Sequence, residues 1–229
     1  MLEFMKVEIL TPTEHLLEQL KIIELAGRTA YQSFKDPITV ESARKFMGML
    51  LRRGHESVIE HSSMTVRFSG VSRGLTHELV RHRLAAFTQE STRYVDEKGF
   101  DFIAPPVIRF GTKPLLDDAV FFMREAYAKL RAAGYPPEDA RQILPIGMGN
   151  EIVVTANLRE WRHIARLRTS KAAHWEIRAA IVKLVEQVRG TLAPLFDEFQ
   201  PAGTCRSGVT YFVSSCTTLE LKEPKPTKE

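Results

Sequence analysis

The sequence predicts one α+β domain, in which a small antiparallel-type sheet is flanked by helices. Short segments that alternate polar and apolar residues, as strands do, are interspersed with longer segments whose apolar residues recur at helical spacing. The chain has 229 residues, of which 44% are hydrophobic and 26% charged, and this composition suits a globular core. We expect a single domain over residues 1–200 and a C-terminal extension over 201–229, partly disordered because Glu223–Glu229 resembles a disordered tail.

The first part of the chain predicts two strands and two helices. Lys6–Leu10 and Met64–Phe68 alternate polar with apolar residues, which is typical of short strands. Between them, Thr13–Arg28 and Thr39–Arg53 are amphipathic and predict helices. Gly54 follows the second helix, where a glycine commonly ends one.

The middle of the chain predicts a helix, a loop and a strand. Ser72 can cap a helix that we expect to run through Arg83, after which the chain continues as a loop. Phe100–Ala104 is predicted to be a strand, which Pro105 and Pro106 end.

The second half of the chain is predicted to be mainly helical. Leu115–Ala133 predicts a helix, and Pro136–Pro145 predicts another, with proline at its start and acidic residues in its first turn. The β-branched run Ile152–Thr155 predicts a buried strand. Leu158–Arg168 and Ala172–Phe199 have helical apolar spacing, so two more helices are expected there.

Charge and cysteine content restrict the function classes. The formal net charge of +4 suits anionic small ligands as well as nucleic acid. Cys205 and Cys216 have neither metal-ligand spacing nor a disulfide framework, so we expect a cytoplasmic protein. The N-terminus lacks the apolar core of a signal peptide, and no apolar run is long enough to cross a bilayer, so no membrane partner is expected.

The segment Arg81–Arg93 brings together three arginines, a histidine, a carboxamide, a carboxylate and hydroxyl groups within a short stretch. Arginine pairs with the oxygens of phosphate or carboxylate two at a time, so this segment can bind an anion. Gln89 and Ser91 could then recognise the polar edges of the same ligand. A solvated basic helix end followed by a loop explains the same composition.

The helix predicted over Leu158–Arg168 has one unusual arginine. At about 100° per residue, one side carries apolar residues and another carries arginines. The apolar side holds Leu158, Trp161, Ile164 and Ala165, and the basic side holds Arg159, Arg162 and Arg166. Arg168 falls in the middle of the apolar side. Either its charged end reaches water over an apolar stem, or it meets an anion in a pocket.

Asn157 precedes this helix, and Glu160 stands three residues later, which is a good capping pattern. A helix start also attracts phosphate, so capping and ligand binding are compatible roles for Asn157. His163 lies beside Arg159 on the polar face, where it either is solvent-exposed or shares a ligand with that arginine. His55 and His61 do not match the metal-binding spacing HExxH or HxxEH, so we expect no metal site there.

Several motifs resemble those of the flavin-dependent thymidylate synthase family. Arg81-His82-Arg83, followed after seven residues by Ser91, is similar to the family's diagnostic motif. Gly54–His61 resembles its GHxSxxEH element. Three further segments resemble later blocks of the family: Asp139–Pro145, Asn157–Arg159 and Leu167–Arg168. The resemblance as a whole runs from about Ala26 to Glu198.

This resemblance implies a reaction and a set of ligands. The reaction is reductive methylation of dUMP to dTMP, with 5,10-methylenetetrahydrofolate as carbon donor and NADPH as reductant through FAD. The family needs no enzyme nucleophile, and the sequence offers no serine or cysteine with an evident activating base. The resemblance also implies a homotetramer whose active sites are shared between subunits.

The resemblance assigns roles residue by residue. FAD-binding residues are then Ser57, Arg81, His82, Arg83, Gln89, Asn157, Leu158, Arg159 and His163. dUMP-binding residues are then Glu78, Leu79, Val80, Arg81, Gln89, Glu90, Ser91, Thr92, Arg93, Arg141 and Arg168. Arg168 is also the catalytic residue, because its charge would favour loss of the N3 proton of uracil.

Two other function classes remain open. A nucleic-acid-binding domain would place on phosphates the arginines Arg81, Arg83, Arg159, Arg162 and Arg166. A flavoprotein acting on another small molecule would also show the visible absorbance of bound FAD, but it would not release the C5 hydrogen of dUMP.

Overall fold

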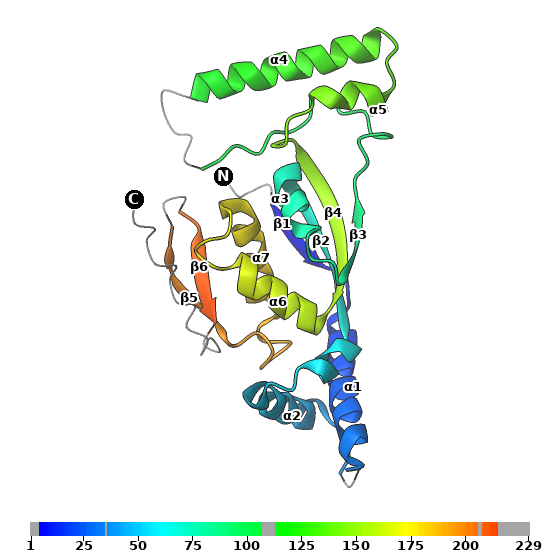
Figure 1. Ribbon diagram of the computed structural model, residues 1–229, viewed down its shortest axis with the longest axis vertical. Helices are drawn as coiled ribbons and strands as arrows, with labels where there is room; N and C mark the ends of the chain where they lie inside the picture. The colour runs from blue at the N-terminus through cyan, green and yellow to red at the C-terminus, as the bar shows by residue number, and fades with distance from the viewer. Residues whose placement is uncertain (1–4, 35, 107–112, 206–207, 215–229) are drawn as a thin grey trace, which may run out of the picture.

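The computed structural model describes residues 5–34, 36–106, 113–205 and 208–214. Its centre is a four-stranded antiparallel sheet with the strand order β1-β2-β4-β3 (Figure 1). These strands are β1 (Lys6–Ile9), β2 (Ser63–Ser72), β4 (Gly149–Asn157) and β3 (Ala85–Gln89). The two long central strands pair from Ser63 opposite Asn157 to Ser72 opposite Gly149, with a register shift between Ser69 and Val71. The predicted α+β class with an antiparallel sheet is confirmed.

Seven α-helices surround this sheet in the part of the chain that the structure describes. They are α1 (Thr13–Tyr31), α2 (Val40–Arg53), α3 (Arg73–Leu79), α4 (Lys113–Ala132), α5 (Pro137–Ala140), α6 (Leu158–Arg168) and α7 (Trp175–Val188). Two short 3-10 turns are η1 (Ser57–His61) and η2 (Arg141–Ile143). In Figure 1, α1 and α2 lie at one end of the molecule and α4 and α5 at the other.

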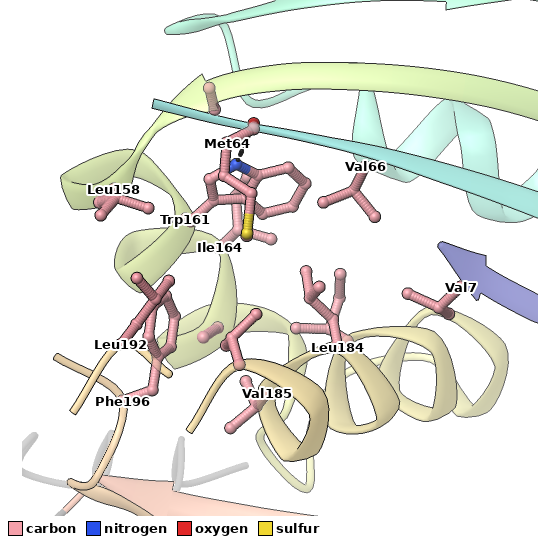
Figure 2. Packing of buried hydrophobic residues seen from close by; sticks show 14 of the residues in the cluster. Val7, Met64, Val66, Leu158, Trp161, Ile164, Leu184, Val185, Leu192 and Phe196 are labelled. Carbon is pink, nitrogen blue, oxygen red and sulfur yellow. Dashed lines mark hydrogen bonds between the residues drawn. The ribbon is translucent and has the colours of Figure 1, made fainter. Parts of the chain in front are cut away.

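The main core lies between the sheet and the helices α6 and α7 (Figure 2). Alternation along β4 turns Ile152 and Val154 into this core, while Val153 on the opposite face is only partly buried. The predicted buried strand is therefore buried on one face. Trp161 of α6 packs beneath β2, and its indole nitrogen donates a 2.8 Å hydrogen bond to the carbonyl oxygen of Met64.

Local signals predicted helix ends well where a cap is present. Gly54 has a φ of +71° at the end of α2, a conformation that glycine adopts without strain. Ser72 accepts a hydrogen bond from the backbone nitrogen of Leu75 and starts α3 as predicted. Helix α3 nevertheless ends at Leu79, so the expectation that it reaches Arg83 is wrong.

Two strand predictions failed for the same physical reason. Strand β3, predicted as a loop, pairs along the edge of β4 from Ala85 opposite Ala156 to Gln89 opposite Ile152. Phe100–Ala104, predicted as a strand, forms only an isolated bridge between Phe102 and Met148. Pairing with a partner distant in sequence decides strand formation, and local composition does not report it.

The C-terminal part departs most from expectation. Helix α7 starts at Trp175 and ends at Val188, so the long helix predicted over Ala172–Phe199 is wrong at both ends. Gly190 and Pro194 are poor helix residues and lie in the turns that follow α7.

A two-stranded sheet of β5 (Phe199–Thr204) and β6 (Thr210–Ser214) crosses the predicted boundary at residue 200. Its residue Phe212 belongs to the main core, so this hairpin packs onto the domain. Cys216 and Glu223–Glu229 lie outside the described residues. Among the helices that the structure describes, none combines the length and apolarity that crossing a membrane would require.

Candidate functional site

Helix α6 carries the residues around which the candidate site is built. Strand β4 leads directly into this helix, and the side-chain oxygen of Asn157 accepts a 2.8 Å hydrogen bond from the backbone nitrogen of Glu160. The predicted cap is therefore confirmed. The cap fixes where α6 begins. Arg168 is the last residue of this helix, and its side chain reaches Glu78 near the end of α3.

Arg168 is held by three polar contacts and does not extend into bulk solvent. Its Nη1 lies 2.8 Å from Glu78 Oε2, and its Nη2 donates to the carbonyl oxygen of Glu78 over 3.1 Å. Its Nε donates to His82 Nε2 over 3.0 Å. The Arg168 side chain is 20% exposed. The pocket interpretation of this arginine is the one that the structure supports.

Arg81 and Arg168 line one cavity of about 630 Å³. Its wall combines charged residues with the apolar residues Phe102, Ile103, Pro105, Ile146 and Trp175. The Arg81 side chain is exposed and has no hydrogen bond or ion pair with any residue that the structure describes. The cavity thus offers one oriented guanidinium, one unpaired guanidinium and an apolar surface, which together suit a planar anionic ligand.

His82 is buried beside Arg168 and is therefore kept neutral. Burial, and then the nearby charges of Arg168 and His163, lower its pKa from 6.5 to about 4. Its Nδ1 lies 3.5 Å from Glu160 Oε1, and its ring meets the ring of His163 edge-on at 5.8 Å. Burial raises the pKa of the Glu160 carboxyl group, an effect that His163 partly offsets.

The donor atoms of His82, Glu160 and His163 all lie within 4.8 Å of one another. This is the one group with metal-ligand spacing among the residues that the structure describes, and the sequence did not indicate it. His55 and His61, which we considered for metal binding, are not part of it. Arg168 occupies one ring nitrogen of His82, and its positive charge disfavours a cation beside that ring.

A second, smaller cavity of about 350 Å³ lies at the start of α6. It brings together three residues that the resemblance assigned to FAD: Asn157, Arg159 and His163. Arg159 forms an ion pair with Glu60 of η1. Leu158 is fully buried in the core, so only its backbone can reach a ligand.

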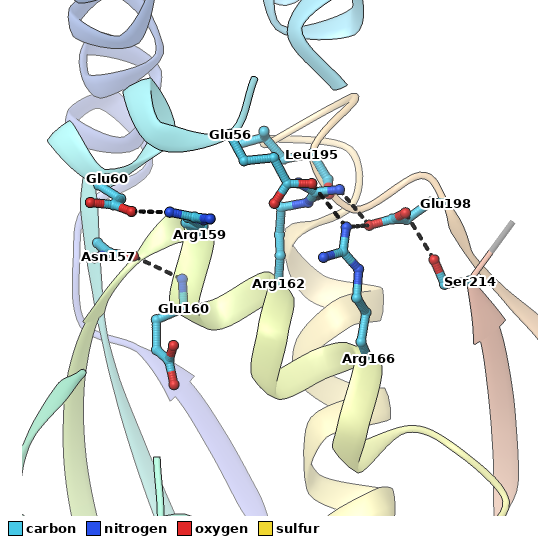
Figure 3. A network of polar contacts seen from close by, with 10 residues as sticks. All are labelled: Glu56, Glu60, Asn157, Arg159, Glu160, Arg162, Arg166, Leu195, Glu198 and Ser214. Carbon is cyan, nitrogen blue, oxygen red and sulfur yellow. Dashed lines mark hydrogen bonds and ion pairs between the residues drawn. The ribbon is translucent and has the colours of Figure 1, made fainter. Parts of the chain in front are cut away.

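Arg162 and Arg166 belong to a separate ion cluster (Figure 3). Arg162 is 1% exposed and pairs with Glu56 at 2.8 Å and with Glu198 at 2.5 Å. Arg166 contacts the same two carboxylates at 3.1 and 3.2 Å. The arginines on the basic side of α6 are therefore paired with acids, which weakens the nucleic-acid hypothesis at Arg159, Arg162 and Arg166. Arg81 and Arg83, which that hypothesis also named, remain exposed.

Two other residues assigned to dUMP, Gln89 and Arg141, make their contacts outside this cavity. Gln89 donates to Thr76 and Asn150 over 2.8 Å each. Arg141 donates to Thr92 over 3.3 Å and to the carbonyl oxygen of Glu138 over 3.1 Å. Neither Gln89 nor Arg141 lines the cavity of Arg81 and Arg168.

The other assigned positions differ in accessibility. The exposed positions are Ser57, Arg83, Arg93 and Val80. The partly buried ones are Ser91 and Glu90, and the buried ones are Leu79 and Thr92. Burial and the neighbouring Glu151 raise the pKa of Glu90, which lines another cavity of about 710 Å³ together with Glu97. Burial is also the main reason that the pKa of Glu97 rises to about 7.

Sequence reasoning missed Glu97 and Glu176 as buried acids. Both carboxylate oxygens of Glu176 accept hydrogen bonds from Ser72, one from its backbone nitrogen at 2.6 Å and one from its hydroxyl group at 2.5 Å. Glu176 lines the same cavity as Arg168. No spacing rule could have found it, because its partner is distant in the sequence.

Comparisons with known proteins agree with one another. The family model described as "Thymidylate synthase complementing protein" matches residues 13–194. Flavin-dependent thymidylate synthase of Geobacter sulfurreducens is 33% identical over 216 residues, covering 89% of this chain and 92% of the relative. The enzyme of the same name from Sulfurisphaera tokodaii is 38% identical over 184 residues, covering 77% of this chain and 71% of the relative.

A solved structure shares the fold. Thymidylate synthase X (ThyX) from Helicobacter pylori, crystallised with FAD and dUMP, superposes with a TM-score of 0.67 at 23% identity and covers 85% of this chain and 98% of its own. Because the family model spans most of the chain and the relatives exceed 30% identity over most of their length, this chain belongs to the flavin-dependent thymidylate synthase family.

Proposed function

We propose that this protein catalyses the reductive methylation of dUMP to dTMP as an FAD-dependent thymidylate synthase. The observation that carries the proposal is the cavity that Arg168, oriented by Glu78 and His82, lines together with Arg81. The Arg81 side chain has no partner among the described residues. Family membership adds the substrate and the cofactor, since the relatives bear the name of that activity.

Arg168 is suited to stabilise an anion that forms on the substrate base. Its guanidinium faces a cavity with a largely apolar wall, where a charge is screened less than in water. Because His82 is neutral, it orients the Nε of Arg168 without cancelling its charge. We assign Arg168 to the uracil ring, where it favours loss of the N3 proton and so makes C5 more nucleophilic.

The residues at the start of α6 fit a flavin nucleotide. Asn157, Arg159 and His163 share one cavity at a helix N-terminus, where the backbone favours phosphate oxygens. The exposed Arg83 adds a cation that has no partner among the described residues. When bound and reduced by NADPH, FAD would supply the reducing equivalents that convert the methylene group from methylenetetrahydrofolate into a methyl group.

We further propose a homotetramer in which each active site combines residues of more than one subunit. Within one protomer, Gln89 and Arg141 do not line the cavity of Arg168, although the resemblance assigns all three to dUMP. A second copy of the chain could bring these residues to one nucleotide. We place the enzyme in the cytoplasm, as expected from its cysteine content.

Two assays test this function. The purified protein, supplied with FAD, should show bound flavin absorbance and should release deuterium from [5-²H]dUMP while forming dTMP with methylenetetrahydrofolate and NADPH. Flavin binding without deuterium release would indicate a flavoprotein with another substrate. Absence of flavin binding under saturating FAD would contradict the proposal altogether.

A further inference from the structure

A buried chain of polar groups runs behind the cavity from Glu160 through His82 to Arg168. Arg168 Nε lies 3.0 Å from His82 Nε2. A guanidinium nitrogen can only donate, so His82 Nε2 must be the acceptor and carries no proton. The imidazole is neutral at physiological pH, because burial and the charge of Arg168 lower its pKa to about 4.

The proton of a neutral imidazole that lacks one on Nε2 must lie on Nδ1. That nitrogen is 3.5 Å from Glu160 Oε1, and the two side chains are only 4% and 7% exposed. A carboxylate has acceptor oxygens only, and its negative charge favours the N–H that points toward it. Both neighbours of His82 therefore select the same tautomer from opposite sides of the ring.

We propose that Glu160 is a positioning residue, which fixes the tautomer of His82 and, through it, the orientation of the Arg168 guanidinium in the cavity. The cap places the carboxylate, because Asn157 binds the backbone nitrogen of Glu160 in the first turn of α6. Without Glu160, the imidazole loses the group that favours its Nδ1 proton. The other tautomer would direct an N–H against the N–H of Arg168 and displace that side chain.

The rival use of the same atoms is a metal site formed by His82, Glu160 and His163. A metal on Nδ1 would force the His82 proton onto Nε2, where the Nε–H of Arg168 already points. The geometry therefore favours the role of Glu160 in fixing the His82 tautomer. The two roles can be told apart by adding zinc, which would change the magnetic resonance signals of His82 and His163 only if they bind it.

Nuclear magnetic resonance of histidine-labelled, FAD-loaded protein reports the tautomer directly. Long-range proton–nitrogen correlations distinguish the two neutral forms, and His82→Gln identifies the His82 signal among the seven histidines. The native protein should carry the proton on Nδ1. Glu160→Gln should largely keep this tautomer, because its amide oxygen still accepts, whereas Glu160→Leu should shift the equilibrium toward Nε2–H.

Three outcomes would overturn the proposal. They are an Nε2–H form in the native protein, an unchanged tautomer in Glu160→Leu, and joint shifts of the His82 and His163 signals with one equivalent of Zn²⁺. Glu160→Gln remains informative where Glu160→Leu fails to fold. This test needs no turnover, so it gives an answer even where the protein binds FAD but does not methylate dUMP.

Kinetics test the consequence for catalysis, which rests on the proposed function. Glu160→Leu should lower kcat at saturating FAD by about tenfold, because the Arg168 guanidinium loses its fixed orientation. FAD is kept saturating because Glu160 also lines the cavity assigned to the flavin. Glu160→Gln should recover most of that loss. Glu186→Gln, which removes an exposed acid of α7, is the charge-matched control and should keep native kcat. Equal kcat in Glu160→Leu and the control would refute the positioning role.

Discussion

Helix α6 carries arginine–carboxylate pairs in two regions, a buried one around Arg162 and a partly open one around Arg168. Arg162 is almost fully buried and meets two carboxylates from separate segments, Glu56 and Glu198 (Figure 3). Arg168, two turns later, is partly exposed and meets one carboxylate, Glu78, which is itself 32% exposed. The contacts of the buried Arg162 hold these segments together. An arginine that keeps one side open to a cavity can exchange part of its contact for a ligand.

The largest expected effect separates the two regions by stability. Arg162→Met should lower the free energy of unfolding by about 3–5 kcal/mol, since it leaves buried carboxylates without their central cation. Arg166 still contacts both acids, which favours the lower end of that range. Urea denaturation measures the loss. Arg159→Met is the matched control, because its ion pair with Glu60 is about half exposed and should contribute at most about 1 kcal/mol.

The opposite outcome is expected at the open arginine. Arg168→Ala should reduce turnover by about 10²–10³-fold, the range for removing one group that stabilises charge in a transition state. Its stability should change far less than that of Arg162→Met, because the Arg168 contacts are partly exposed. Initial rates with saturating dUMP and FAD measure the effect. Retained turnover in a folded, flavin-binding variant would remove Arg168 from the chemistry.

The buried imidazole between these regions makes stability depend on pH. The pKa of His82 is about 4 in the folded chain and about 6.5 when unfolded, so the unfolded state takes up the proton first as pH falls. The contribution of His82 to stability is unaffected above about pH 6.5 and should decrease by about 3 kcal/mol between there and about pH 4. Glu97, whose pKa burial raises to about 7, contributes in the opposite sense over the same range.

Denaturation across this pH range isolates the His82 effect as a difference: the stability of the native chain relative to His82→Asn should fall by about 3 kcal/mol from pH 6.5 to about pH 4. His77→Asn, an exposed histidine of α3, should keep the native slope. The Glu56 carboxyl group also loses stabilising contacts in acid, because Arg162 and Arg166 hold its pKa below 4.5 against the opposing effect of burial. Its effect therefore begins at lower pH than that of His82. Parallel slopes for both histidine variants would contradict the buried, neutral His82.

The sequence predicts secondary structure correctly where that structure depends on residues close together in the chain. Helix α6 was predicted over Leu158–Arg168, and the structure gives the same bounds, because the Asn157 cap and the apolar spacing are both local. Arg162 shows the limit of this reasoning. Face analysis placed it on the basic side of α6, but η1 and the segment around Glu198 cover that side and bury it.

The candidate site combines contacts across long separations in sequence. The contact of Arg168 with His82 joins residues 86 apart, and its contact with Glu78 joins residues 90 apart. No periodicity in the sequence predicts such contacts, so only the motif resemblance assigns these residues to one site. The same limit explains β3, whose strand character comes from pairing with β4.

The smallest expected effect concerns how Arg162 and Arg166 share the carboxylates of Glu56 and Glu198. Arg166 is 34% exposed on its side chain, and Arg166→Met alone should lower the free energy of unfolding by about 1 kcal/mol or less. Combined with Arg162→Met, the loss should exceed the sum of the single losses by about 1 kcal/mol, because each arginine compensates the same carboxylates when the other is removed. A double-mutant cycle in urea measures this coupling. Strict additivity would mean that the two arginines act on Glu56 and Glu198 independently, and the cluster would then be two separate ion pairs on one helix.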